Sequence, residues 1–239
     1  MVEEINVINL ESLKLKGVSL NKKSLSACKA IRNLSLTCWD MEDSSSLEYL
    51  ISNLPLLEDL AFSNGRNWAL KHIKISSKHL KRVIVTNPFD NEMTVIIKSA
   101  PNLASLYYVG NIKFSVSMEP SNLLNGTFVI LKQQENYDTD WFINLMNFLL
   151  NLNCSWNKIR LHVDSVEALI LPKYLKRICR SPLVTLNHLR VFTECKPEKE
   201  KELVLKDVLR WISPSLKTLF IGEKGPLLKS LQKAAYLFV

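Results

Sequence analysis

Apolar residues along the chain recur in a short pattern, L-x-x-L-x-L, that joins two kinds of spacing. Within residues 50–62, LISNLPLLEDLAF, they first recur at the three- and four-residue steps of a helix face, whereas Leu57, Leu60 and Phe62 end in strand-like alternation. Pro55 separates the two parts, because proline removes a backbone donor and disfavours helix in the preceding residue. The stretch therefore predicts a helix, a turn and a short strand.

The pattern is repeated along the chain at nearly regular distances. Copies start at residues 10, 31, 57, 70, 80, 103, 156, 186 and 216. The starts at 57, 80 and 103 are 23 residues apart and those at 156, 186 and 216 are 30 apart, in or just beyond the range of leucine-rich repeats. The copy at 70 is out of step, which suggests an outer strand, and residues 126–131, GTFVIL, are the best strand candidate in the gap after 103.

We therefore predict an α/β leucine-rich-repeat solenoid, a curved horseshoe with short parallel strands on the concave side and helices on the convex side. The alternative is a leucine-rich α/β protein with accidental matches, but the regular spacing favours the repeat. An asparagine or cysteine three positions after the last leucine is clear only at Asn111, so we expect the usual ladder of side-chain hydrogen bonds to be mostly absent. Helix patterns cover residues 22–30, 44–54, 92–99, 139–152 and 203–212.

The bulk composition is that of a folded protein without a membrane anchor. The 239 residues are 47% hydrophobic and 23% charged, which fits one irregular repeat domain over residues 1–239, with a subdivision into 1–115 and 136–239 as the alternative. The apolar run 141–152 is too short for a membrane span, and the acidic N-terminus does not resemble a signal peptide. Five cysteines without a C-x-x-C pair indicate reduced thiols and a cytoplasmic or nuclear location.

No motif in the sequence indicates catalysis or cofactor binding. A nucleophile motif, a phosphate-binding glycine loop and a metal-ligand cluster are not found. Neighbouring strands could align His162 and His188, but no carboxylate or cysteine accompanies them at ligand spacing, and Asp164 is better explained as a turn residue. We therefore predict a protein that is not an enzyme and needs no metal or other cofactor.

The strand register predicts a basic concave face. Apolar repeat positions point into the core, so residues between and just beyond them face outward on the concave side. Those positions are Lys14, Lys16, His72, Lys74, Arg82, Tyr107, Lys158, Arg160, His162, His188 and Arg190, with Asp59 as the clear acid. Together with the net charge of +8 they suggest an acidic or phosphorylated protein partner.

Two other interpretations of the basic positions stay open. They could be solvated strand positions without a partner, or the face could be a basic scaffold for nucleic acid or another polyanion. We rank nucleic acid below protein, because only Tyr107 and Phe192 are in register to stack on bases.

Three segments resemble plant F-box/leucine-rich-repeat proteins of the FBD type: SLEYLISNLPLLEDLAF, VIIKSAPNLASLYYVG and VLRWISPSLKTLFI. The resemblance implies that the repeats select a protein for ubiquitination by a Skp-cullin ligase, which the family's F-box binds. Only nine residues precede Leu10, too few for the three helices of an F-box, so we expect an F-box-free repeat region and ligase binding only if an F-box is supplied elsewhere.

Overall fold

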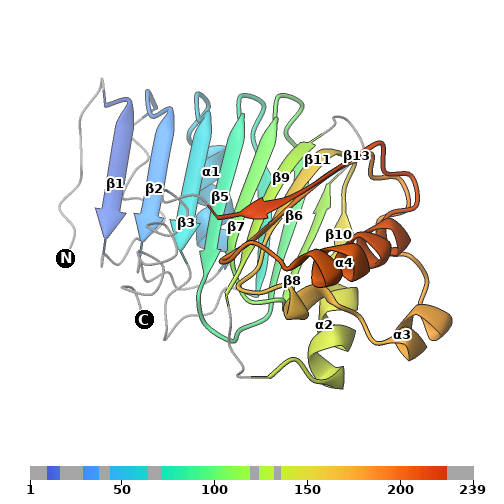
Figure 1. Cartoon of the computed structure of the whole chain (residues 1–239). Coiled ribbons are helices and arrows are strands. Elements are labelled where there is room, and N and C mark those ends of the chain that lie inside the picture. The colour runs from blue at the N-terminus through green and yellow to red at the C-terminus, as the bar shows by residue number, and fades with distance from the viewer. Residues whose placement is uncertain are drawn as a thin grey trace.

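The computed structural model describes residues 10–16, 29–37, 44–63, 71–118, 124–131 and 136–224. Nine parallel strands form one sheet in the order β1-β2-β3-β5-β7-β9-β11-β12-β13 (Figure 1). Their bounds are β1 Ser12–Lys16, β2 Asn33–Thr37, β3 Asp59–Ser63, β5 Arg82–Asn87, β7 Ser105–Gly110, β9 Leu124–Ile130, β11 Trp156–His162, β12 His188–Thr193 and β13 Thr218–Glu223. Each in-step copy of the apolar pattern thus supplies one strand, as does the GTFVIL segment.

The pairing register confirms the repeat residue by residue. One row of paired positions runs Leu13, Leu34, Leu60, Val83, Leu106, Gly126, Ile159, Leu189 and Leu219. The next core row, two positions along each strand, runs from Leu15 to Ile221 and includes Phe62, Tyr108 and Phe128. Most members are buried, because a five-residue strand is stable only when its apolar face is covered by its neighbours.

A second layer covers one face of the large sheet, and part of it is made of strands. The strands β4 His72–Ser76, β6 Met93–Ser99, β8 Phe114–Met118 and β10 Leu152–Asn153 form a four-stranded parallel sheet in the order β10-β8-β6-β4. The helices are α1 Ser44–Ser52, α2 Thr139–Leu150, α3 Lys173–Ile178 and α4 Lys199–Ile212, with a 3₁₀ turn at Glu167–Leu169. In Figure 1, α2, α3 and α4 gather at the C-terminal end of the solenoid.

The helix predicted at residues 92–99 is wrong, since this segment forms β6. Its core-facing side chains Met93, Val95 and Ile97 alternate with Thr94 and Ile96, a period of two enriched in β-branched residues. The 23-residue repeats return to the sheet through an extended strand, whereas the 30-residue repeats have room for helices. The outer-strand prediction for the copy at 70 is confirmed by β4.

Three of the other helix predictions are confirmed. The helices α1, α2 and α4 occupy the segments predicted at 44–54, 139–152 and 203–212. Asp138 caps α2, as its side chain accepts a 2.9 Å hydrogen bond from the backbone of Trp141. The helix predicted at 22–30 falls largely outside the described residues. Among the described helices, none has the length and apolar character needed to cross a membrane.

Asparagine and threonine side chains hold the loops at the carboxyl ends of the strands. The buried Asn111 donates to the carbonyls of Phe89 and Asn91 and accepts from the backbone of Lys113. Thr193 donates to the carbonyl of Cys195 at the corresponding end of β12. These bonds satisfy backbone groups that the turn leaves without a sheet partner.

Candidate protein-recognition surface

The concave face is the face of the nine-stranded sheet that points away from the second layer. Strand alternation places two outward rows on it that remain accessible. The first row contains Ser12, Asn33, Asp59, Arg82, Ser105, Asn125, Lys158, His188 and Thr218, and the second contains Lys14, Ser35, Ala61, Ile84, Tyr107, Thr127, Arg160, Arg190 and Phe220. These two rows are the surface on which a partner could lie.

The structure places nine of the eleven predicted residues on this face. The nine are Lys14, Lys16, Arg82, Tyr107, Lys158, Arg160, His162, His188 and Arg190. The prediction is wrong for His72 and Lys74, because these residues lie on β4, in the four-stranded outer sheet. Their repeat copy is out of step with its neighbours, and the concave rule does not apply to an outer strand.

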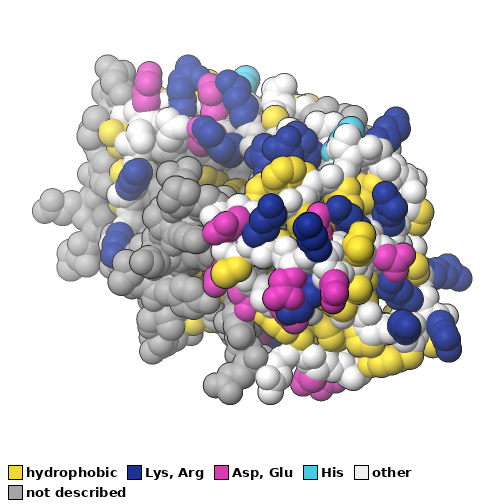
Figure 2. All heavy atoms as spheres, in the orientation of Figure 1, with side chains coloured by type: hydrophobic (Ala, Val, Ile, Leu, Met, Phe, Trp, Pro, Cys, Tyr) yellow, Lys and Arg dark blue, Asp and Glu magenta, His cyan; other side chains and the backbone are white. Residues whose placement is uncertain are grey.

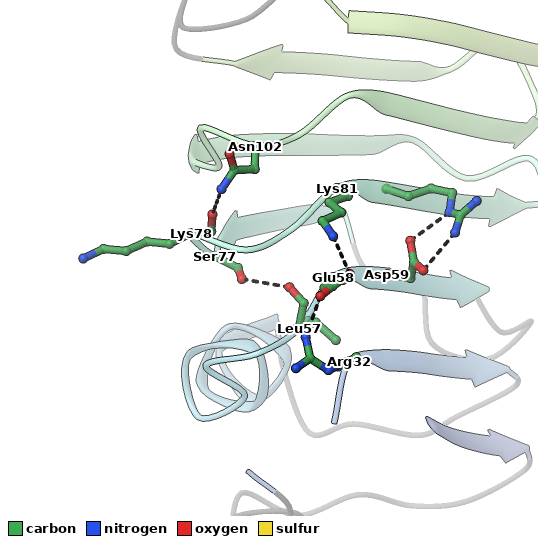
Figure 3. Close-up of polar contacts among 9 residues, drawn as sticks. Arg32, Leu57, Glu58, Asp59, Ser77, Lys78, Lys81 and Asn102 are labelled. Carbon is green, nitrogen blue, oxygen red and sulfur yellow. Dashed lines mark hydrogen bonds and ion pairs between the residues drawn. The ribbon is translucent and has the colours of Figure 1, made fainter. Parts of the chain in front are cut away.

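At the N-terminal end of the face Arg82 is neutralised by a carboxylate, and so are Arg32 and Lys81 at the edge of the sheet. Arg82 forms a two-pronged pair with Asp59, with nitrogen–oxygen distances of 2.8 and 2.9 Å. At the edge where β2, β3 and β5 begin, Glu58 accepts from Arg32 at 2.6 Å and from Lys81 at 2.7 Å (Figure 3). Hydrogen bonds from Lys81 and Arg32 lower the pKa of Glu58. Arg82 is therefore already committed to Asp59.

At the same edge of the sheet, uncharged hydrogen bonds between successive repeats add to these ion pairs. Ser77 donates to the carbonyl of Leu57, and Asn102 donates to the carbonyl of Lys78 at 2.8 Å (Figure 3). Each contact joins one repeat to the next along the stack. Exposed ion pairs each contribute little to the free energy of unfolding. We therefore assign these edge contacts a role in fixing how the repeats stack.

A shallow apolar hollow lies between these charged residues. Its volume is about 100 Å³, and it extends over β1, β2, β3 and β5. The small side chains of Ser35 and Ala61 form its floor, with Ile84 at one side. A partner side chain placed here would contact apolar surface beside the Arg82–Asp59 pair.

At the C-terminal end of the face the basic residues have no acidic partners within the described part of the chain. No ion pair or hydrogen bond joins Lys158 or Arg160 to another described side chain, and Arg190 lies over the ring of Phe220, with 5.7 Å from Cζ to the ring centroid. His188 is 2.8 Å from the hydroxyl of Thr218. Near β13, Lys and Arg side chains border exposed hydrophobic ones (Figure 2). We call Lys158, Arg160, Arg190 and Phe220 the C-terminal basic patch.

Phe220 is a surface residue that the sequence prediction omitted. It is 49% exposed and stands in the same register row as Arg160 and Arg190. Its ring centroid is 5.5 Å from that of Phe192, whose own ring stacks on His162 at 4.5 Å. The signal was present in the sequence, because Phe220 stands between Leu219 and Ile221 as Arg190 stands between Leu189 and Val191.

Two predicted residues are too buried to serve as open surface. His162 is 1% exposed, and neither ring nitrogen has a hydrogen-bond partner among the described residues. Tyr107 is half-buried beside Val109, Val129 and Leu131, a small apolar cluster on the concave side, and burial raises the pKa of its hydroxyl to about 12. Both residues support the surface from below.

His162 is expected to make the protein less stable in mild acid. Desolvation, with smaller effects from Lys224 and Arg160, lowers its pKa from 6.5 to about 4. Between these values the unfolded chain binds a proton that the folded protein does not, so stability is lost as pH falls below about 6.5. From pH 7 to pH 5 the loss is about 2 kcal/mol. Urea denaturation at both pH values would measure it, and in His162→Leu this part of the loss should disappear.

The fold and this surface define the protein as a leucine-rich-repeat solenoid with a single layer of parallel strands along its concave face. A family model described as FBD-associated F-box protein At5g56370, LRR repeats, matches residues 4–123. The chain belongs to this family of leucine-rich repeats from FBD-associated F-box proteins, which act in general as protein-interaction modules. Searches of curated proteins and of solved structures each found no significant match.

Proposed function

We propose that this chain is a recognition module that binds an acidic or phosphorylated segment of a partner protein along its concave face. The observation that carries the proposal is the C-terminal basic patch, where three exposed or half-exposed cations have no acidic partner among the described residues. Lysine and arginine side chains on such a surface attract anionic segments over about 10 Å and bind them by charge-assisted hydrogen bonds. In the context of the family, the bound protein would be the one selected for ubiquitination.

A photo-crosslinking comparison tests which face binds. A benzophenone amino acid is placed at Phe220 on the concave face or at Leu203, which is 67% exposed on α4 in the second layer. We expect crosslinks to a discrete partner from position 220 and not from position 203 in native cells. Crosslinking from position 203 alone would contradict a concave binding site.

The ubiquitin-ligase role needs a separate test. The tagged chain and the same chain fused to an F-box are purified from native cells and analysed by mass spectrometry. Recovery of Skp and cullin subunits only with the fusion, and of the same partner with both, would support a recognition module that depends on a supplied F-box. Loss of the shared partner in the fusion would contradict it.

Binding of nucleic acid is the second candidate, and one observation favours it. Arg190 lies over the exposed ring of Phe220, and a cation beside an aromatic ring is the arrangement on which a base can stack. A single-stranded oligonucleotide should then bind with a steep dependence on salt concentration. In Lys158→Gln the slope of log affinity against log salt should fall by about 0.7 for one lost phosphate contact.

A further inference from the structure

The charge pairing along the concave face is uneven. Towards the N-terminal end, Arg82 is paired with Asp59, and Arg32 and Lys81 share Glu58. Towards the C-terminal end, Lys158, Arg160 and Arg190 form no ion pair with any residue in the described ranges. A site for an anion therefore belongs on β11 and β12 and not on β3 and β5.

Arg160 and Arg190 are direct lateral neighbours. They are paired in register on adjacent parallel strands, which places their backbones about 4.8 Å apart with both side chains on the same face. Lys158 lies two positions earlier on β11, on the same face and about 7 Å along the strand. Three cations thus lie within one small area, and within the described part of the chain no carboxylate pairs with them to offset their mutual repulsion.

The surroundings restrict how these side chains can move. The Arg190 guanidinium lies over the Phe220 ring, 5.7 Å from its centroid, where the ring attracts the cation but takes up none of its N–H donors. The rings of Phe220, Phe192 and His162 follow one another across β13, β12 and β11. His162 lies two positions beyond Arg160, buried, and its ring nitrogens have no partner among the described residues. Arg160 and Arg190 therefore lie beside a row of three aromatic rings that contributes no negative charge.

We propose that Arg160 and Arg190, assisted by Lys158, form a binding site for a phosphorylated serine or threonine side chain of the partner protein. This inference rests on the proposed function and narrows it to one locus and one chemical group. A phosphate monoester carries a charge of about −1.5 to −2 and three acceptor oxygens at neutral pH, enough for two guanidinium forks. A single carboxylate, with one charge and two oxygens, would leave one arginine uncompensated.

The test uses bead-bound peptide libraries of random sequence with one fixed central residue: phosphoserine, serine or glutamate. The full chain is labelled with a fluorophore, and binding is compared with that of two variants. Arg160→Gln/Arg190→Gln removes the site. Lys74→Gln/Lys98→Gln is the matched control, because it removes the same charge from exposed positions on β4 and β6 of the outer sheet. Circular dichroism and urea unfolding confirm that both variants are folded.

We expect the phosphoserine library to retain the wild type and the control at least about tenfold better than the serine library. The arginine variant should lose at least about tenfold in affinity per arginine. Equal retention by the glutamate library would overturn phosphate recognition while leaving an acidic partner in place. Equal binding by the arginine variant, no preference for phosphoserine, or stronger competition by a single-stranded oligonucleotide at matched phosphate concentration would each overturn the site.

The crosslinking result at position 220 is independent of these libraries. If a partner crosslinks there but phosphoserine gives no preference, the recognition surface stands and the phosphate site is wrong. If no partner crosslinks and no library binds, both proposals fail together.

Discussion

Replacing Gly126 by alanine is expected to destabilise the protein by about 1–3 kcal/mol, because the core at this position is already full. A glycine-to-alanine change inside a strand ordinarily stabilises by a few tenths of a kcal/mol or more. Here an added Cβ would lie 2.7 Å from the Phe128 ring and 2.8 Å from the Trp156 ring. Gly126 occupies the leucine position of its repeat, and the Trp156 ring from the next repeat fills the space a leucine would take.

The cause can be isolated by a double-mutant cycle with Trp156→Leu. That change alone should cost about 2–4 kcal/mol, since it removes a buried ring packed edge-on against Phe128 and an indole N–H bonded at 3.0 Å to the carbonyl of Leu152. In the Trp156→Leu background the contact with Trp156 is gone and the one with the Phe128 ring remains, so Gly126→Ala should cost clearly less than in the wild type. Urea denaturation of the four proteins gives the coupling energy, which we expect to exceed about 1 kcal/mol. The same cost in both backgrounds would show that the ring contact is not the reason for the glycine.

Replacing Asn111 by alanine should cost about 3 kcal/mol of unfolding free energy. The side chain is 1% exposed, accepts from the Lys113 backbone at 2.6 Å, and donates to the carbonyls of Asn91, at 3.0 Å, and Phe89. Alanine would leave the carbonyls of Phe89 and Asn91 and the backbone N–H of Lys113 without these partners in a partly buried turn. Urea denaturation measures the loss, and amide hydrogen exchange at Lys113 should accelerate.

Asn125→Ala is the matched control for this change. Asn125 is also an asparagine at an inner strand, but its side chain is exposed: it donates a long 3.4 Å bond to the carbonyl of Ala104 and accepts a 3.1 Å bond from the exposed Asn157. Its loss should cost less than about 0.5 kcal/mol. A similar cost at both positions would mean that hydrogen bonding by Asn111 is not what stabilises the loop.

The inner sheet could be predicted from the sequence because its signal is local and repeated. Leu60, Leu106 and Leu189 each follow an apolar residue by three positions, and all are buried in paired register. Gly126 broke the pattern because its missing side chain is replaced by a ring that stands thirty residues later. A compensation of this kind between repeats leaves no trace within either repeat alone.

The second layer was harder to predict, since a short apolar run fits a helix or a strand. Residues 92–99 contain four consecutive β-branched residues, at 94–97, yet no glycine or proline within the segment marks the ends of the strand. Repeat length is the better guide, because 23 residues return through a strand and 30 through helices.

The face on which the candidate residues lie could be predicted from the sequence, but which of them form ion pairs could not. Alternation correctly placed Arg82 and Arg160 on one face, whereas only the structure shows that Arg82 is paired with Asp59 and that Arg160 has no ion pair with any residue it describes. Ion pairing between repeats depends on which side chains stand side by side across strands, at sequence distances that vary with repeat length. His162 was likewise placed on the correct face, but its burial depends on residues that are distant in the sequence.

The inner strands stay in register while the outer segments change from helix to strand. The position of a side chain on the concave face is therefore defined by its repeat and its row alone, and residues inserted in the outer layer change neither. Arg160 and Arg190 are adjacent although thirty residues separate them, since one repeat is one lateral step. Binding specificity can thus change by substitution at a few strand positions, and the outer layer can gain or lose residues independently of it.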